Sequence, residues 1–376
     1  MKYMGSKRSM LLNGLGEAIQ SAVPGHKRFV DMFTGSAAVA WHVAQKYDVE
    51  VLAGDLQKYS VVLASSVIGR TKPLKRKWLE DWADRATTWE AASDFVGRTK
   101  RLQKRIATED IKSTCDRARD LCAEMPYPIS KAYGGYYFSP QQSLTIDALR
   151  ATLPLNKDAR CAALASLIWV ASRCAAAPGH TAQSFKPNLT AGEFLKAAWQ
   201  RDVGACLHQS YDAIAPMFSK RKGAATKTDA NDMASTLKEG DIAFLDPPYS
   251  GVHYSRFYHV LETLVGGKLV AVSGEGRYPE IGKRPQSKYS LVKSSEDAFE
   301  ALLKSLASVG TDAIITFPAG EASNGLSGER VTELANQFFR IKSSKVTSRF
   351  STLGGNSRNR DARQPSEEMI LTLTAR

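Results

Sequence analysis

The sequence predicts an α/β protein, a Rossmann-like sheet interrupted by a long and largely helical insertion. Two observations lead to this fold class. Short apolar runs that end at turn residues or acids occur within residues 28–55 and again within 241–317, as buried parallel strands do. Between these segments, residues 71–225 lose the strand pattern and show long charged or alanine-rich stretches that favour helices. We therefore expect a discontinuous sheet domain, residues 1–70 and 226–376, around the insertion.

Composition excludes several classes of protein. The 376 residues are 43% hydrophobic and carry a net charge of +13, which favours a polyanionic partner. No apolar stretch is long enough to cross a membrane, and the N-terminus has no signal-peptide core. The five cysteines form no C-x-x-C pair, which predicts reduced thiols in a cytoplasmic protein without a zinc site.

The N-terminal segment has the layout of a nucleotide site. Its expected order is strand, tight turn, helix, strand and acid, at residues 28–33, 34–36, 37–47, 50–54 and Asp55. Gly35 lets the backbone approach a ligand, and Asp55 is placed to accept hydrogen bonds from ribose hydroxyls. Because the segment lacks a full G-x-G-x-x-G motif, a nucleoside cofactor without phosphates fits better than a dinucleotide.

A proline-stiffened turn is the most informative feature of the chain. The apolar run 242–245 leads into Asp246-Pro247-Pro248-Tyr249. Neither proline donates to a sheet ladder, so the strand ends here at the carboxyl edge of the sheet, where open α/β folds bind ligands. A carboxylate, unpaired carbonyls and an aromatic ring suit an extruded base that carries an exocyclic amine.

The remaining segments complete the expected fold. After the turn we expect helices at 256–265, 295–309 and 329–339, a strand at 312–317 and a hairpin at 344–351 and 368–374. Three basic runs lie at 70–77, 98–105 and 220–222. They favour contact with nucleic acid phosphates, which positions a protein without reading sequence.

In order along the chain, these pieces resemble the DNA methyltransferases that modify adenine at N6, of the deoxyadenosine methylase type. Residues 246–249 match the family's catalytic motif without change. Residues 31–36 resemble its cofactor loop, written Asp-x-Phe-x-Gly-x-Gly, with Ala37 in place of the second glycine. Residues 3–8 resemble its N-terminal motif. The resemblance covers nearly the whole chain.

The resemblance implies specific site residues. The implied cofactor-binding residues are Tyr3, Gly5, Lys7, Asp31, Phe33, Gly35, Ser36, Asp55, Asp232 and Asp246. The implied catalytic residues are Asp246, Pro247, Pro248 and Tyr249. The implied substrate-binding residues are Tyr249, Tyr254 and His259, with a late loop at Gly354, Gly355, Asn356 and Asn359. No metal is implied.

The family resemblance also implies fold and activity. The expected fold is a mixed seven-stranded sheet with an antiparallel last strand, and the insertion is expected to recognise the target in double-stranded DNA. The expected reaction moves a methyl group from S-adenosylmethionine to N6 of a flipped adenine by direct transfer. Methylation of the cytosine N4 amine and a non-catalytic DNA-binding role are the alternatives. A cognate restriction endonuclease is a candidate partner, and the oligomeric state is left open.

Overall fold

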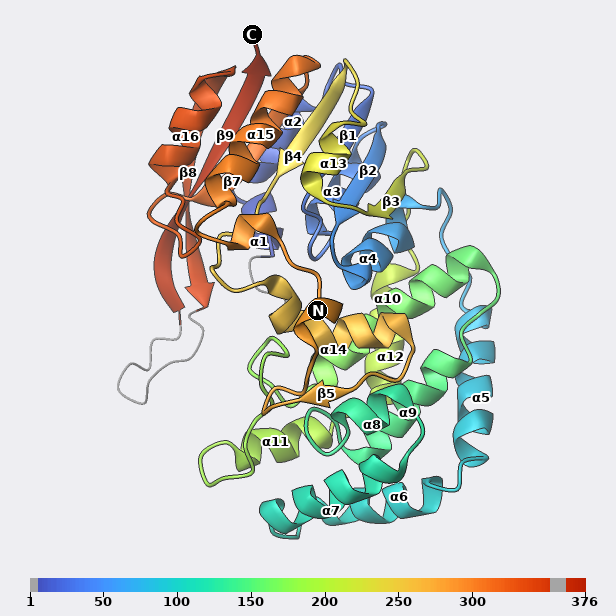
Figure 1. The fold of residues 1–376 in the computed structure, drawn as a ribbon. Coiled ribbons are helices and arrows are strands. Elements are labelled where there is room, and N and C mark those ends of the chain that lie inside the picture. The colour runs from blue at the N-terminus through green and yellow to red at the C-terminus, as the bar shows by residue number, and fades with distance from the viewer. Residues whose placement is uncertain (1–5, 352–362) are drawn as a thin grey trace. The chain divides into compact units, whose positions relative to one another are not determined.

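The computed structural model describes residues 6–351 and 363–376 and divides the chain into two compact units. The sheet unit contains the described parts of Met4–Thr71, Phe218–Tyr254 and Gln286–Arg376, and the helical unit contains Lys72–Met217 and Ser255–Pro285 (Figure 1). The sequence placed residues 255–285 with the sheet, whereas the structure packs them in the helical unit. Tyr133 and Thr263, for example, share a hydrogen bond of 2.8 Å between their buried hydroxyls.

A mixed seven-stranded sheet forms the centre of the sheet unit, with the order β3-β2-β1-β4-β7-β9-β8. The strands are β1 (Arg28–Asp31), β2 (Glu50–Asp55), β3 (Ala224–Lys227), β4 (Asp241–Leu245), β7 (Asp312–Pro318), β8 (Phe339–Ser351) and β9 (Arg363–Ala375). Neighbours from β3 through β7 pair in parallel, and β9 is antiparallel to both β7 and β8. The predicted fold class, including the antiparallel last strand, is confirmed.

Helices cover both faces of this sheet (Figure 1). They are α1 (Arg8–Leu11), α2 (Leu15–Ala22), α3 (Ala38–Lys46), α4 (Lys58–Ile68), α13 (Ala230–Ala234), α15 (Ser295–Ser308) and α16 (Gly328–Asn336), with a 3-10 turn η2 at Lys288–Ser290. Helix α15 buries Phe299, Leu302, Leu303 and Leu306 in one core with the central strands. This spacing places the four side chains on one helix face, so α15 packs firmly on the sheet.

The helical unit has its own core. Its elements are α5 (Lys77–Ala91), α6 (Val96–Arg105), α7 (Ile111–Glu124), α8 (Pro128–Tyr133), α9 (Pro140–Ala151), α10 (Lys157–Cys174), α11 (Gly192–Trp199), α12 (Val203–Ile214), α14 (Tyr254–Gly266, whose first residue belongs to the sheet unit), β5 (Val272–Ser273), β6 (Tyr278–Pro279) and η1 (Ile281–Lys283). Trp199, Met125 and Cys122 are buried together in one cluster. Ser139 begins α9 with a capping box completed by Gln142. None of the helices in the described chain is both long and apolar enough to cross a membrane.

Sequence patterns missed the strands β3, β5 and β6 and shortened both strands of the terminal hairpin, β8 and β9. Strand β3 is a short edge strand whose side chains are mostly exposed, so no apolar run marks it. Strand β8 begins at Phe339, within the stretch expected to continue a helix. Among the predicted site residues, Tyr3, Gly5 and the late loop at 354–359 lie outside the described residues.

Candidate active site

The candidate site lies where the order of the parallel strands reverses. From β1 the chain proceeds to β2 and β3 on one side, while β4 and β7 follow on the other. Asp31 ends β1 and Asp246 directly follows β4, and register pairs Asp31 with Phe244. The two acids therefore meet at the carboxyl edge of adjacent strands, at the switch point where such sheets bind ligands.

A tight turn after β1 is held by the acid that ends β2. The Asp55 carboxylate accepts hydrogen bonds of 2.8 Å from the backbone N–H groups of Gly35 and Gln57. Thr34 N–H donates to the Gly54 carbonyl at 3.1 Å. Gly35 has a φ of 50°, which a glycine adopts without strain. Asp55 thus orients the turn and lies beside it at the strand end.

Ala37 occupies a left-handed backbone conformation at the start of α3. Its φ is 61° and its ψ is 15°, and its side chain is fully buried. Residues with a Cβ rarely adopt this conformation, which costs roughly 1–2 kcal/mol. The structure therefore explains why a glycine is expected here, and it shows that alanine keeps the turn closed at the cost of backbone strain.

Replacing Ala37 with glycine is expected to stabilise the protein by about 0.5–1 kcal/mol, because relief of the left-handed strain exceeds the added freedom of the unfolded chain. Thermal or denaturant unfolding measures the change. Ala40→Gly is the matched control, since Ala40 is buried inside the same helix; it should destabilise by about 1 kcal/mol. An Ala37→Gly variant as destabilised as the control would contradict the assigned strain.

Asp31 is a buried acid with an unsatisfied oxygen. Its side chain is 1% exposed, and burial, with the nearby charges of Asp246 and Asp55, raises its pKa to about 8. Within the described part of the chain, its Oδ1 atom has no hydrogen-bond partner. Buried polar atoms are normally paired, so this oxygen fits a site that is completed by a polar ligand.

An aromatic pair stands beside the turn. Phe33 meets Tyr289 edge to face, with ring centroids 5.0 Å apart. The Tyr289 hydroxyl donates to Asn231 Oδ1 at 2.6 Å. Apolar rings beside carboxylates at strand ends suit a nucleoside, so the residues present fit the predicted cofactor.

The acid at the end of β3 differs from the predicted one. Asp232 is exposed on α13, whereas Asp229 follows β3 at the same edge as Asp55. Asp229 is half-buried and caps α13 by accepting from Asn231 N–H at 2.9 Å. Its neighbour Thr228 donates its backbone N–H to the Asp55 carbonyl at 3.1 Å. We therefore place Asp229, not Asp232, in the candidate site. Only the position of a polar edge strand could have revealed it.

Asp246 lies in a charged cluster with Lys7 and Glu368. Lys7 Nζ is 3.0 Å from Asp246 Oδ1 and 2.8 Å from Glu368 Oε2. Thr316 donates its hydroxyl to the same Asp246 Oδ1 at 3.0 Å, so both contacts use one oxygen of the carboxylate. Glu368 was not predicted, because an acid at the start of an apolar strand gives no motif signal.

Charge and burial tune this cluster. Burial raises the pKa of Asp246 to about 6, with Lys7 opposing that rise and Glu368 adding to it. Burial lowers the pKa of Lys7, but the two carboxylates outweigh it and the net shift is upward. The ammonium therefore stays charged across the pH range in which Asp246 titrates.

Neighbouring loops brace the proline turn. Asn324 is fully buried and donates its Nδ2 to the carbonyls of Pro248 at 2.9 Å and Tyr289 at 3.0 Å. Pro247 is buried and Pro248 half-buried. Gly251 N–H donates to Ser323 Oγ at 2.9 Å. Such bracing presents the turn as a rigid surface.

Aromatic side chains flank the turn. The Tyr249 ring packs edge to face against Phe317, with centroids 6.4 Å apart, and Lys7 Nζ lies 5.9 Å from its centroid. Tyr254 hydrogen-bonds to Tyr249, and burial raises its pKa well above the usual value. The structure thus brings Lys7, Asp246, Tyr249 and Tyr254 together, while Ser36 lies beside the N-terminal segment through Ser6, at 3.3 Å between hydroxyls.

His259 has a packing environment inside the helical unit. It is 2% exposed, and its ring nitrogens lie 3.1 Å from the Arg256 carbonyl and 2.8 Å from the Gly276 carbonyl. Burial lowers its pKa to about 4, so the ring is neutral at physiological pH. We therefore leave His259 out of the site proposed below, although its place soon after the catalytic motif suggested a substrate contact.

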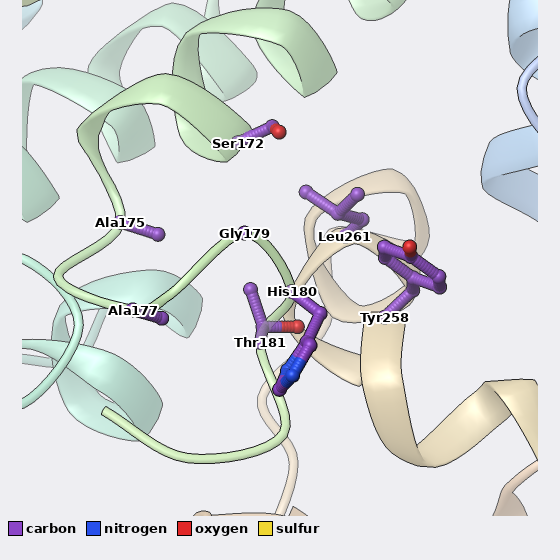
Figure 2. Close-up of a pocket in the computed structure, with 8 residues that line it drawn as sticks. All are labelled: Ser172, Ala175, Ala177, Gly179, His180, Thr181, Tyr258 and Leu261. Carbon is purple, nitrogen blue, oxygen red and sulfur yellow. The ribbon is translucent and has the colours of Figure 1, made fainter. Parts of the chain in front are cut away.

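A small cavity lies beside the kink at Tyr258 in α14 (Figure 2). Thr181 donates both its N–H and its hydroxyl to the Phe257 carbonyl at 2.7 Å next to this kink. The cavity has a volume of about 10 Å³, enough for one water molecule. It is lined by Ser172, Ala175, Ala177, Gly179, His180, Thr181, Tyr258 and Leu261. It is too small to bind a base. No group of three metal-ligating side chains occurs among the described residues.

Carboxylates and a glycine turn on one side of the switch point, with a proline-stiffened acidic turn on the other, fit an amino-directed methyltransferase. Comparison with known proteins gives the family. A model of the D12 class N6 adenine-specific DNA methyltransferases matches residues 3–315. The chain belongs to this family. The predicted reaction is confirmed at the level of the family: methylation of adenine N6 in DNA, with S-adenosylmethionine as the methyl donor.

Relatives with assigned roles are distant in sequence. The chain is 24% identical to the type II methyltransferase M.NlaIII of Neisseria lactamica over 321 residues, covering 81% of this chain and 80% of that protein. It is 25% identical to M.CviAII of Paramecium bursaria Chlorella virus 1, covering 75% and 73%. It is 25% identical to M.FokI of Planomicrobium okeanokoites, covering 81% of this chain but 42% of that protein.

Proposed function

We propose that Asp246 and the Pro247 carbonyl activate the N6 amine of a flipped adenine. Each accepts a hydrogen bond from one of the amine's two N–H groups. The carrying observation is that Lys7 and Thr316 both bind Asp246 Oδ1, so neither uses Oδ2. The adenine amine is a weak nucleophile because its lone pair is delocalised into the ring. Hydrogen bonds from both N–H groups to these acceptors favour a pyramidal nitrogen whose lone pair points to the methyl donor. Positioning of this kind supplies much of the acceleration.

The cofactor side is assigned to residues on the other strand ends. We assign Asp55 to the ribose, Asp229 and the Phe33–Tyr289 pair to the nucleoside, and Asp31 with the Gly35 turn to the remaining polar groups. S-adenosylmethionine supplies an electrophilic methyl group when bound. Lys7 contacts Asp246 of the catalytic turn, and Ser36 beside the Gly35 turn contacts Ser6, the residue before Lys7.

Tyr249 is the proposed stacking surface for the extruded base. It follows the prolines on the braced turn and is only partly buried. Unstacking a base from duplex DNA costs a few kcal/mol, which stacking in the enzyme offsets. The phenol hydroxyl contacts Tyr254 and is not needed for stacking.

Tyr249→Ala is expected to weaken binding of target DNA by about 1–3 kcal/mol, because it removes base stacking. With 2-aminopurine at the target position, fluorescence reports whether the base leaves the duplex. The wild type should give a large increase, and Tyr249→Ala a small one. Tyr249→Phe is the control and should behave like the wild type. Equal fluorescence and affinity in all three proteins would contradict the stacking role.

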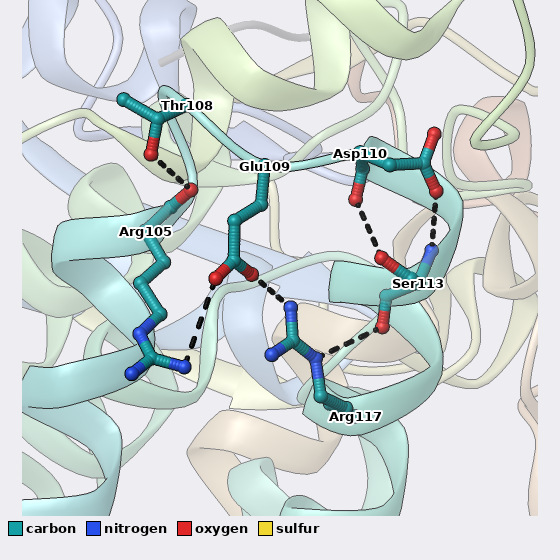
Figure 3. A network of polar contacts seen from close by, with 6 residues as sticks. All are labelled: Arg105, Thr108, Glu109, Asp110, Ser113 and Arg117. Carbon is teal, nitrogen blue, oxygen red and sulfur yellow. Dashed lines mark hydrogen bonds and ion pairs between the residues drawn. The ribbon is translucent and has the colours of Figure 1, made fainter.

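The helical unit is proposed to contact DNA phosphates. A groove of about 350 Å³ between α6 and α7 is lined by Arg98, Arg101, Leu102, Arg105, Arg117, Asp120, Leu121 and Glu124. Carboxylates orient several of these arginines. Glu109 pairs with both Arg105 and Arg117 (Figure 3), and Glu124 binds Arg98 at 2.7 and 2.9 Å. Among the described residues, Arg101 is the lining arginine without a carboxylate at ion-pair distance.

Arg101→Ala is therefore expected to weaken DNA binding to a similar extent for all sequences. The slope of log affinity against log salt should fall by about 1, the loss of one phosphate contact. Binding titrations at several salt concentrations measure it. Arg160→Ala is the control, because Arg160 is exposed on α10 away from the groove. The groove proposal fails if both variants have the wild-type slope.

We further propose that the enzyme accompanies a restriction endonuclease of the same sequence specificity. This proposal rests on the three relatives, which are named type II methyltransferases. Sequencing DNA methylated by the purified enzyme identifies the target. Cleavage of that target by an extract of the source cells, blocked by prior methylation, would support the partnership. An extract that leaves the unmethylated target intact would argue against it.

A further inference from the structure

Glu368 is a buried acid at the active-site edge with no role so far. Only 5% of the residue is exposed. Glu368 lies in β9, and register pairs it with Pro318, the last residue of β7. Because β9 is antiparallel, a residue near its beginning reaches the edge where the parallel strands end. The family match stops at residue 315 and does not include it.

One ammonium is shared by two carboxylates here. Lys7 Nζ lies 2.8 Å from Glu368 Oε2 and 3.0 Å from Asp246 Oδ1. Lys7 is 4% exposed, so bulk water does not screen this arrangement. With a single carboxylate present, the lysine would neutralise Asp246. With two, the ammonium is shared, and these three groups alone carry one negative charge when both carboxylates are ionised.

We propose that Glu368 is a positioning residue for methyl transfer, which holds the Lys7 ammonium on the Oδ1 side of Asp246. The Oδ2 atom of Asp246 is thereby left to accept a hydrogen bond from the target amine. This inference rests on the role proposed above for Asp246. It assigns Lys7 a second carboxylate partner, Glu368 from β9.

The pH dependence gives a readout that a merely structural role would not change. Among the described residues, the titratable groups that interact electrostatically with Asp246 include Lys7, Glu368, Asp31 and Tyr254, and Tyr249 hydrogen-bonds to Tyr254. Asp246 has a pKa of about 6 and must be ionised to accept both the lysine and the amine. Activity is therefore present above about pH 6 and is lost as the pH falls through that value. Glu368 raises this pKa. Replacing Glu368 with a neutral residue should therefore move the acid limb of the pH profile, where activity falls at acid pH, to lower pH.

The test compares Glu368→Gln with Glu367→Gln in single-turnover methylation across pH. Glu367 is the neighbouring residue, exposed and paired with Lys345 at 3.5 Å, so it carries the same charge change outside the site. For Glu368→Gln we expect methyl transfer at pH 8 to fall about 10–100-fold, as for other small displacements of reacting groups. The KM values for DNA and cofactor should change little. The acid limb should move down by about half a pH unit or more, following removal of a like charge. Glu367→Gln should match the wild type.

Two outcomes would overturn the inference: a wild-type rate and acid limb in Glu368→Gln, or a lower rate with an unmoved limb. If Glu368→Gln does not unfold cooperatively, Glu368→Asp replaces it. That variant keeps the charge but not the reach, so its rate should fall while its limb stays at the wild-type pH. A wild-type rate in Glu368→Asp would then overturn the inference.

Asp246→Asn separates this inference from the proposed function. Activity in Asp246→Asn would contradict the role of Asp246 itself. An inactive Asp246→Asn together with a wild-type Glu368→Gln would contradict the role of Glu368 alone.

Discussion

Asp246→Ala is expected to abolish detectable methyl transfer while DNA binding remains measurable. The variant loses the carboxylate that accepts the target amine, and removal of one such preorganised group costs about 100–1,000-fold or more in rate. Folding should survive, because Lys7 keeps its contact with Glu368 at 2.8 Å and is not left as an unpaired buried charge.

The measurement is incorporation of labelled methyl groups into DNA, followed by identification of the modified base. Binding of the same DNA is titrated in parallel. Asp297→Ala serves as control, since Asp297 is exposed on α15; it should methylate normally. Near-normal transfer by Asp246→Ala would remove the basis of the proposed mechanism.

Lys7→Met should have the largest effect on stability. It leaves the buried Glu368 and the partly buried Asp246 without their shared cation. Removing one partner of a buried charge cluster typically costs about 3–5 kcal/mol. Because two like charges then face each other, the pKa of Asp246 should rise, and the acid limb of activity should move to higher pH.

Thermal unfolding and the pH profile of methylation measure these two effects. The stability loss should shrink as the pH falls, because protonation of Asp246 removes its repulsion by the neighbouring carboxylate. Lys304→Met is the control, with an exposed lysine on α15. A variant of Lys7 with wild-type melting temperature and an unmoved acid limb would show that the ion cluster is not formed.

Local patterns in the sequence predict the centre of this fold. Strand β4 is found at the predicted residues because all five of its side chains are buried, and a fully buried strand leaves a continuous apolar run. The Asp55 position follows from the same reasoning, since a strand, a glycine turn and a helix precede it.

The less predictable parts depend on contacts between distant segments. The choice of Asp229 over Asp232 requires knowing where a polar edge strand ends. Glu368 reaches the site only through the antiparallel pairing of β9 with β7. His259 has the polarity of a substrate contact, and only the packing of α14 with residues of the helical unit shows that it is buried.

The antiparallel last strand has a consequence for biosynthesis. Lys7 is near the beginning of the chain, whereas Glu368 lies in β9, which inserts between β7 and β8. A nascent polypeptide that has emerged only as far as Pro318 contains the proline turn and the glycine turn. Of the two carboxylates that pair with Lys7, it contains Asp246 but not Glu368. Chains that lack β9 should therefore transfer methyl groups poorly.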